Sequence, residues 1–411
     1  MKHRIVVLGA GYAGSHVAGA LARRLSPRDA EITVVNAEPD FVQRLRLHQL
    51  AAGQDIDAPL LADVFAGTGV RLRLGRVTGV DTGRRAVAVA DADGGGELGY
   101  DTLVYALGSH FAVNGVPGVA EHAFDVSGRP SALRLRERLA ALDAAGGGGN
   151  VVVVGDGLTG IETATEIAES RPGLSVTLIA RGELGARLSA GARGHLRRAC
   201  HRLRITVLEH TEVEAVEAAR VRCADGTVLA ADATVWTAGF AVGPLAAAAG
   251  LDVTEHGRIV VDRTMRSVSH PDVYAVGDSA YALGDNGLPL PMSCATAGAT
   301  GMQAVKAIVG GLSGGKVAHA KLAYVANHIS LGRQDGILQM VDGEGLAKNG
   351  YVGGRRAARV KALIVWMSLW ATSHPTFGVP RRSHRVATAS AASPASAASA
   401  ASAVAGEKAV A

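Results

Sequence analysis

The chain has 411 residues, 48% of them hydrophobic, and is long enough to bury the cores of two or three domains. Its net charge of +5 is not clustered, so we expect no nucleic-acid partner. The cysteines Cys200, Cys223 and Cys294 form no C-x-x-C pair, which excludes a metal ribbon and an active-site disulfide. We therefore expect reduced thiols, no bound metal and a cytoplasmic location.

The amino-terminal segment has the pattern of a strand, a tight turn and a helix. The apolar run Ile5–Leu8 predicts a buried strand, Ser15–Leu25 a helix and Glu31–Val35 the next strand. The turn has the sequence Gly9-Ala10-Gly11-Tyr12-Ala13-Gly14. In such a loop the first glycine makes the turn, the second lets a pyrophosphate approach, and the third lets the helix pack on the strand. Because the start of the helix offers free N–H groups, the loop predicts a dinucleotide site.

A second unit of the same kind follows further along the chain. Val151–Val154 predicts a buried strand, Ile161–Glu169 its helix and Val176–Ile179 the next strand. The glycine spacing recurs at Gly155, Gly157 and Gly160, and Asp156 between them should point away from a pyrophosphate. Two dinucleotides held by one polypeptide indicate electron transfer between them.

An acidic residue that binds the ribose hydroxyls is expected about 20 residues past each loop. The first position holds Asn36, with Glu38 two residues on, and the second holds Ala180 followed by Arg181. Asparagine can still hydrogen-bond a ribose hydroxyl. The missing carboxylate and the added cation make NADPH at least as suitable as NADH, so the choice of nucleotide stays open. Alternatively, Arg181 is an ordinary solvated side chain.

The remaining patterns predict an α/β fold with two Rossmann-like, doubly wound domains. Because the pattern after residue 239 completes the first domain, the second domain is inserted in the first. Further helices are expected at Arg44–Ala52, Ser131–Leu142 and Ala295–Val309. Further strands are expected within Val70–Val89 and at Thr102–Ala106, Thr206–Leu208, Val221–Cys223, Thr234–Thr237 and Val273–Val276, with a turn-rich hairpin tip at Asp91–Gly99.

Three further motifs give these domains a family resemblance. Tyr100–Ser109 has the form YD-x-L-V-x-A-x-G, Val235–Phe240 contains W-x-A-G, and Asp272–Asp278 ends in Gly-Asp. With the two glycine loops, and in this order, they resemble the two-dinucleotide-binding flavoproteins, in particular the type II NADH dehydrogenase and apoptosis-inducing-factor-like group. The resemblance covers residues 1 to about 310.

The resemblance implies an oxidoreductase with FAD and NAD(P)H as cofactors. Residues 1–112 and 240–317 would form the FAD-binding domain, and residues 113–239 the inserted NAD(P)H-binding domain. The implied cofactor-binding residues are Gly9, Ala10, Gly11, Tyr12, Ala13, Gly14, Asn36, Arg44, Val77, Ala106, Gly108, Gly155, Gly157, Leu158, Gly160, Arg181, Ala238, Gly239, Gly277 and Asp278.

The resemblance also implies a catalytic role for Glu162. In related flavoproteins the matching glutamate lies beside the flavin and nicotinamide, often near a cation, and Arg44 or Arg46 would be that cation here. Arg46 is therefore a second candidate catalytic residue. Alternatively, Glu162 only stabilises the start of its helix. His48 lies in the same segment as the two arginines, and a structural role is the alternative for it.

The electron acceptor stays open at this stage. Type II dehydrogenases carry an A-Q-x-A-x-Q stretch at the quinone site, whereas Pro291–Gly298 contains no glutamine. The acceptor is a quinone or a soluble electron-transfer protein such as ferredoxin; alternatively the protein is a flavin redox sensor with slow turnover. Cys294 in this stretch is either redox-active or a small core residue.

Residues 318–385 form a C-terminal region. Basic residues in Arg355–Lys361 precede the apolar stretch Ala362–Ala371, which contains Trp366 and Trp370. This pattern fits an anchor on the inner face of the cell membrane; a cover over the flavin domain or a homodimer contact is the alternative. Asn327–Gln339 predicts a turn-linked strand pair near the flavin edge. Residues 386–411, rich in Ala and Ser, predict a disordered tail.

Overall fold

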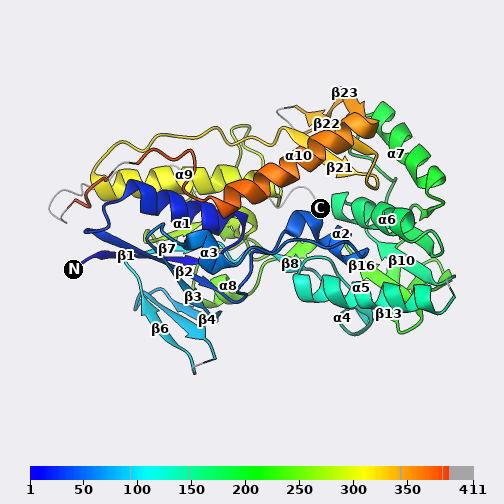
Figure 1. The fold of residues 1–411 in the computed structure, drawn as a ribbon, viewed down its shortest axis with the longest axis horizontal. Helices are drawn as coiled ribbons and strands as arrows, with labels where there is room; N and C mark the ends of the chain where they lie inside the picture. The colour runs from blue at the N-terminus through cyan, green and yellow to red at the C-terminus, as the bar shows by residue number, and fades with distance from the viewer. Residues whose placement is uncertain (93, 147, 343–344, 382, 388–411) are drawn as a thin grey trace.

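The protein is described from a computed structural model, which describes residues 1–92, 94–146, 148–342, 345–381 and 383–387. Two parallel sheets form the centres of two lobes that lie side by side (Figure 1). This arrangement confirms the predicted α/β class with Rossmann-like cores. The predicted tail lies outside the described residues except for residues 386 and 387.

The first parallel sheet has the strand order β19-β7-β1-β2-β3. Its central strand β1 is apolar on both faces, and Ile5, Val7 and Leu8 are at most 1% exposed, as expected of a strand covered on both sides. The bounds of the strands are β1 (His3–Leu8), β2 (Ala30–Asn36), β3 (Val70–Leu74), β7 (Thr102–Tyr105) and β19 (Val273–Ala275).

The second parallel sheet, in the order β12-β11-β10-β16-β9, repeats the arrangement of the first. In both sheets the strand before the glycine loop is central, and the next strand of the unit lies beside it. The bounds of the strands are β9 (Ala123–Phe124), β10 (Asn150–Val154), β11 (Ser175–Ile179), β12 (Thr206–Leu208) and β16 (Ala233–Trp236). All of them fall between residues 113 and 239.

Helices follow both glycine loops and cover the sheets. α1 (Tyr12–Arg24) follows the first loop and packs against α9 (Cys294–Ser313) on one side of the first sheet (Figure 1). α6 (Leu158–Ser170) follows the second loop. The second lobe also contains α5 (Arg129–Ala144) and α7 (Ala190–Arg202). Shorter helices are α3 (Leu61–Phe65), α4 (Val119–His122), α8 (Leu245–Ala248) and the 3-10 turn η2 (Gly277–Ser279).

Small antiparallel sheets complete the lobes. One projects from the first lobe and contains β4 (Arg76–Asp81), β5 (Ala86–Ala90) and β6 (Gly96–Gly99) (Figure 1). Another contains β13 (Val213–Glu217), β14 (Arg220–Cys223) and β15 (Val228–Ala230). β18 (Ile259–Val260) pairs with β20 (Ala280–Tyr281). β8 (His110–Phe111) pairs antiparallel with β17 (Phe240–Ala241), so the two chain crossings between the lobes are hydrogen-bonded together.

The segment Arg44–Ala52 differs from the single helix that its sequence predicts. It consists of the 3-10 turn η1 (Arg44–Arg46) followed by α2 (Leu47–Ala51). Leu47 and Leu50 pack in the same apolar cluster as residues of β10, α5 and α6 in the second lobe. This segment therefore belongs to the sequence of the first predicted domain but contributes to the core of the second lobe.

The C-terminal region forms a sheet and a long helix. β21 (Ala326–Ser330) and β22 (Gly336–Val341) pair antiparallel, which confirms the predicted turn-linked strands, and β23 (Ala347–Gly353) pairs with β22. α10 (Gly354–Ser373) runs from this sheet toward α1, across both lobes (Figure 1). No helix among the described residues is long and apolar enough to cross a bilayer.

Candidate active site

The two glycine loops have the same geometry at the ends of the central strands. Gly9 follows β1 with φ +94° and Gly155 follows β10 with φ +114°, a region that favours glycine. The N–H of Gly9 donates to the carbonyl of Val35 at 2.8 Å, and that of Gly155 donates to the carbonyl of Ile179 at 2.9 Å. Each loop is therefore fixed to the next strand before its helix begins.

The second and third glycines of each loop differ in what a side chain would meet. A Cβ added at Gly11 or Gly157 would find no atom within 4 Å, and both glycines line the cavity described below. A Cβ at Gly14 would lie 1.9 Å from the carbonyl oxygen of Gly9, and the corresponding distance at Gly160 is 1.8 Å. The third glycines thus allow helix to pack on strand, and the second leave room for a ligand, as pyrophosphate loops require.

A cavity of about 1460 Å³ extends along both loops. It is larger than the roughly 300–1,000 Å³ of an ordinary small-molecule pocket, which fits two dinucleotides better than one small ligand. The predicted cofactor-binding residues line it, except for the two packing glycines Gly14 and Gly160. The residues present therefore fit FAD and NAD(P)H held in one continuous site.

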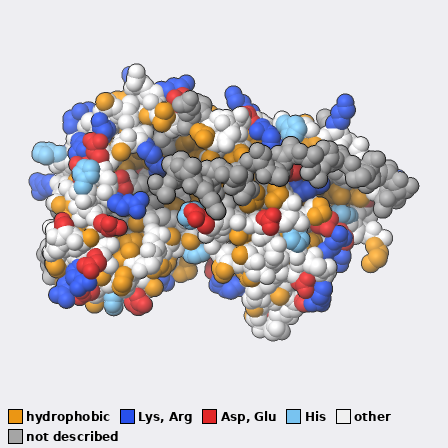
Figure 2. Space-filling model, turned by 180° about the vertical axis from the view of Figure 1, so that it is seen from behind, with side chains coloured by type: hydrophobic (Ala, Val, Ile, Leu, Met, Phe, Trp, Pro, Cys, Tyr) orange, Lys and Arg blue, Asp and Glu red, His pale blue; other side chains and the backbone are white. Residues whose placement is uncertain are grey.

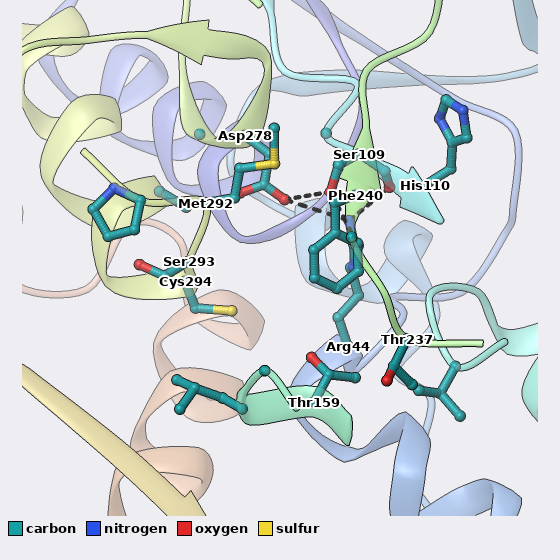
Figure 3. Close-up of a pocket in the computed structure, with 18 of the residues that line it drawn as sticks. Arg44, Ser109, His110, Thr159, Thr237, Phe240, Asp278, Met292, Ser293 and Cys294 are labelled. Carbon is teal, nitrogen blue, oxygen red and sulfur yellow. Dashed lines mark hydrogen bonds and ion pairs between the residues drawn. The ribbon is translucent and has the colours of Figure 1, made fainter. Parts of the chain in front are cut away.

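Asp278 lies on η2 at the end of the first sheet, in a small polar network. The Ser109 hydroxyl donates to Oδ2 of Asp278 at 2.7 Å, and Nη1 of Arg44 lies 3.7 Å from the same oxygen. Arg44 also donates to the carbonyl of Ser109 at 2.9 Å. Figure 3 shows this network facing Thr159 and Thr237, which come from the second lobe. Residues of both lobes thus meet around one space.

Asn36 lines the cavity at the end of β2 and helps to hold the first loop. Its Oδ1 accepts the N–H of Ala10 at 2.9 Å, and its Nδ2 donates to the carbonyl of Glu38 at 2.7 Å. The amide oxygen keeps a second lone pair, so contact with a ribose hydroxyl remains compatible with these bonds.

Glu162 lines the cavity from the first turns of α6 and is 8% exposed. Its Oε1 lies 2.9 Å from Nζ of Lys361 and accepts the N–H of Ser330 at 2.8 Å. The predicted pairing with Arg44 or Arg46 is therefore wrong. The reason is tertiary: α10 and the end of β21 pack over α6 and bring their own donors to the carboxylate, whereas both arginines bond elsewhere.

Burial opposes the ionisation of Glu162, but Lys361, His48 and the N–H of Ser330 outweigh it and lower the pKa of the carboxyl. Burial also lowers the pKa of His48 to about 4, so this histidine is neutral near pH 7. At neutral pH the charge on Glu162 is therefore compensated by Lys361. His48 Nε2 is buried and has no hydrogen-bond partner among the described residues.

Arg46 lies beside this cluster without reaching the cavity. Its Nε donates to Oε1 of Gln49 at 2.8 Å, and the residue is not part of the cavity lining. Burial and the nearby charge of Arg333 lower its pKa. The catalytic role expected of Arg46 stays a prediction, and no contact in the described structure adds to it.

Cys294 lies at the start of α9 and lines the cavity. Burial, and next the charge of Asp278, raise the pKa of its thiol to about 12. The other two thiols, Cys200 and Cys223, are buried, and all three are free cysteines. Because only a thiolate is strongly nucleophilic, the geometry favours the reading of Cys294 as a small, protonated side chain.

A protein that holds two dinucleotides in one cavity belongs to the class of FAD- and NAD(P)H-dependent oxidoreductases. Among these, the chain belongs to the pyridine nucleotide-disulphide oxidoreductase family, whose model matches residues 3–305. It is 33% identical over 317 residues to an NADH dehydrogenase-like protein of Mycobacterium tuberculosis, a match that covers 71% of this chain and 76% of the relative. It is 25% identical to a type II NADH:quinone oxidoreductase of Staphylococcus haemolyticus over 88% of this chain and 94% of that relative.

The fold is also found among solved structures. NDH2 from Plasmodium falciparum, in complex with NADH, superposes with a TM-score of 0.76 and 15% sequence identity, over 92% of this chain and 98% of that chain. At this identity the likeness concerns the fold alone.

The two residues that contact Glu162 were not predicted from the sequence. Lys361 ends the basic stretch that was interpreted as a membrane anchor, and Ser330 lies in the strand pair that had no assigned role. A signal was present for the lysine, because Lys361 has apolar neighbours on both sides in the helical sequence. For Ser330 only the backbone N–H takes part, which no sequence pattern indicates.

Proposed function

We propose that the protein passes electrons from NAD(P)H to a quinone with FAD as the carrier. The observation that carries the proposal is the single cavity lined by both glycine loops and by Lys361. The relatives named for quinone oxidoreduction support the acceptor. In this arrangement residues 1–112 and 240–317 hold FAD, and residues 113–239 hold the nicotinamide nucleotide.

Bound FAD would supply the redox chemistry, by taking a hydride from the nicotinamide and giving its electrons to the acceptor. The chain positions the two cofactors. The open spaces at Gly11 and Gly157, beside the N-termini of α1 and α6, suit two pyrophosphates. Asp278, fixed by Ser109 and Arg44, offers a carboxylate to the hydroxyl groups of the flavin nucleotide.

Lys361 is suited to bind and stabilise an acceptor that is reduced at an oxygen atom. Its ammonium group has three protons to donate. One points to Glu162 at 2.9 Å and a second donates to the carbonyl of His328 at 3.0 Å. The third is available to a quinone oxygen in the cavity, and the paired Glu162 keeps the local charge balanced. Lys361 and Glu162 are thus our candidates for stabilising the reduced acceptor.

We further propose that α10 rests on the surface of a membrane. The helix that carries Lys361 exposes Leu363, Trp366 and Met367 to 54%, 59% and 54%. Exposed arginines lie in its first turns, at Arg355, Arg356 and Arg359. Cations beside an exposed apolar stripe are typical of helices that lie in the interface of an anionic bilayer. An apolar quinone dissolved in the lipid would then reach the cavity along this helix.

The test is an anaerobic stopped-flow experiment on the purified yellow protein. We expect NADH or NADPH to bleach the flavin absorbance rapidly, and a short-chain quinone to restore it. Restoration by an acidic ferredoxin and not by quinones would overturn the quinone as acceptor. A flavin that neither nucleotide bleaches would overturn the enzymatic proposal and leave a redox sensor. A protein that does not take up FAD would contradict the assignment of the first loop.

The lysine is tested with Lys361→Met in the same experiment. We expect recovery with quinone to slow much more than bleaching by the nucleotide, because the ammonium donates a hydrogen bond to the acceptor. Equal losses in both half-reactions would indicate a structural role instead.

A further inference from the structure

The end of β11 occupies the place where the second Rossmann unit meets the ribose of the adenosine. The two units correspond residue by residue there: Leu8 pairs with Val35 across β1 and β2, and Val154 pairs with Ile179 across β10 and β11. Ala180 therefore takes the place of Asn36.

No carboxylate is present at this place in the second unit. Ala180 is fully buried, and its methyl group offers nothing to a ribose hydroxyl. Its N–H donates to the carbonyl of Leu208 at 2.8 Å, and its carbonyl accepts the N–H of Thr211 at 3.1 Å. These bonds fix the backbone, so the next residue, Arg181, leaves the sheet at a defined point on the cavity wall.

Two arginines of the segment that follows β11 line the cavity. Arg181 and Arg187 both line it and are exposed. Neither guanidinium has a hydrogen-bond or ion-pair partner within the described part of the chain. The carboxylate of Glu183, in the same segment, pairs with Arg193 and Arg197 instead. The guanidinium groups of Arg181 and Arg187 are therefore free to bind an anion.

Three acidic side chains of the second lobe line the cavity: Glu162 pairs with Lys361, whereas Glu212 is exposed and Asp156 lies in the glycine loop. The two guanidinium groups offset the charges of Asp156 and Glu212, so no excess of negative charge from these residues opposes a phosphate. Guanidinium groups bind phosphate with paired N–H donors, and a dinucleotide carries a third phosphate only as NADP(H). A plain ribose diol would leave both arginines without a partner.

We propose that the nicotinamide substrate is NADPH in preference to NADH, with Arg181 and Arg187 binding its 2′-phosphate. The inference rests on the proposed function, because it assigns the substrate of the same site. The relatives described above are named for NADH, so the preference is a property of the residues of this chain.

The kinetic test compares NADPH and NADH as reductants of the flavin holoenzyme. We expect kcat/KM to favour NADPH by roughly tenfold or more, the range of a hydrogen bond to a charged group. Arg181→Asp should reverse the preference, since its carboxylate repels the phosphate and can accept a hydrogen bond from a ribose hydroxyl. Arg187→Ala should lower kcat/KM for NADPH by about the same tenfold factor and leave that for NADH unchanged.

Arg220→Ala, on an exposed arginine that pairs with Glu217, is the matched control and should change neither value. Equal or better use of NADH by the unmodified protein would overturn the proposal.

A binding test separates this inference from the proposed function. The probes are 2′,5′-ADP and 5′-AMP, which differ only in the 2′-phosphate. We expect 2′,5′-ADP to bind more tightly in titration calorimetry of the holoenzyme, and Arg181→Asp to abolish the difference. If the flavin is not reduced by either nucleotide but this difference is found, the oxidoreductase proposal fails and the phosphate site stands. Equal affinity for both probes would overturn the phosphate site even in an active enzyme.

Discussion

The carboxylate of Glu162 on α6 lies 2.9 Å from the ammonium group of Lys361 on α10, and the two side chains are only 10% and 13% exposed. The pair joins the C-terminal helix to the helix that begins at the second glycine loop. It also lies at the cavity wall, so it combines a structural contact with a place in the proposed site.

We predict that Lys361→Met destabilises the protein by about 3–5 kcal/mol, because it leaves a buried carboxylate unpaired. The double variant Glu162→Gln/Lys361→Met should recover a large part of that loss, since no buried charge remains. Urea unfolding of both variants measures the free energies. A single variant as stable as the double one would contradict the prediction.

A second prediction concerns pH. Burial lowers the pKa of His48 to about 4, so its contribution to stability is lost as the pH falls from about 6.5 toward 4. Burial raises the pKa of Glu166 to about 7, so its contribution has the opposite sign and is lost as the pH rises from about 4.5 toward 7. Between pH 5 and 6.5 the two effects oppose each other.

Single variants should separate these effects. We expect the unfolding free energy of His48→Gln, relative to the unmodified protein, to fall as the pH rises from 5 to 6.5, by up to about 1.4 kcal/mol per pH unit. For Glu166→Gln, the unfolding free energy relative to the unmodified protein should instead rise over the same pH range, by a similar amount. Denaturant titrations at several pH values give the slopes. If the relative unfolding free energies of the two variants changed with pH in the same direction, the opposite pKa shifts assigned to His48 and Glu166 would be wrong.

The glycines of the first loop should respond differently to alanine. Gly14→Ala places a Cβ 1.9 Å from the carbonyl of Gly9, and we expect a loss of about 1–3 kcal/mol of stability from overpacking. Gly11→Ala meets no protein atom and should leave the apoprotein as stable as before. It should weaken FAD binding, because the methyl group enters the space for the pyrophosphate. Thermal unfolding of the apoprotein and titration with FAD measure the two effects, and equal FAD affinity in Gly11→Ala would contradict the site.

Asp278→Asn should weaken FAD binding by roughly 10- to 100-fold, the value of one hydrogen bond to a charged group. The amide keeps the size of the side chain but removes the charge that faces Arg44. Fluorescence titration of the apoprotein with FAD gives the dissociation constant. Asp272→Asn is the control, because Asp272 pairs with Arg85 and does not line the cavity. Equal effects of both variants would show that the loss is not local.

The proposed contact of α10 with lipid predicts binding to anionic vesicles. Trp366→Ser/Met367→Ser should reduce co-sedimentation with them several-fold, since both side chains are more than half exposed. Val228→Ser, at a residue 54% exposed on β15, removes a comparable apolar side chain from the second lobe and should have no effect. No sedimentation of the unmodified protein would contradict the membrane contact.

On the face shown in Figure 2, lysine and arginine side chains lie among aspartate and glutamate side chains over both lobes. This mixture agrees with the reading of the modest net charge as unclustered. The vesicle contact therefore depends on a local feature of α10 rather than on a basic surface as a whole.

The sequence by itself determined the two dinucleotide units. Glycine spacing, apolar strands and helix starts are local properties, and Gly9, Gly14 and Gly155 occupy the backbone positions that their spacing predicts. The order of the motifs was sufficient to identify the family. The sequence pattern of residues 327–339 was sufficient to predict the strand pair there.

Only the tertiary structure decided which groups meet at the cavity. The partner of Glu162 is Lys361 rather than Arg44 or Arg46, because packing of α10 and β21 on α6 excludes water and supplies the nearest donors. The burial of His48 follows from the packing of α2 on α5 and α6. Contacts between segments far apart in the chain leave no periodic signal in either segment, so only the fold shows which charges line the cavity.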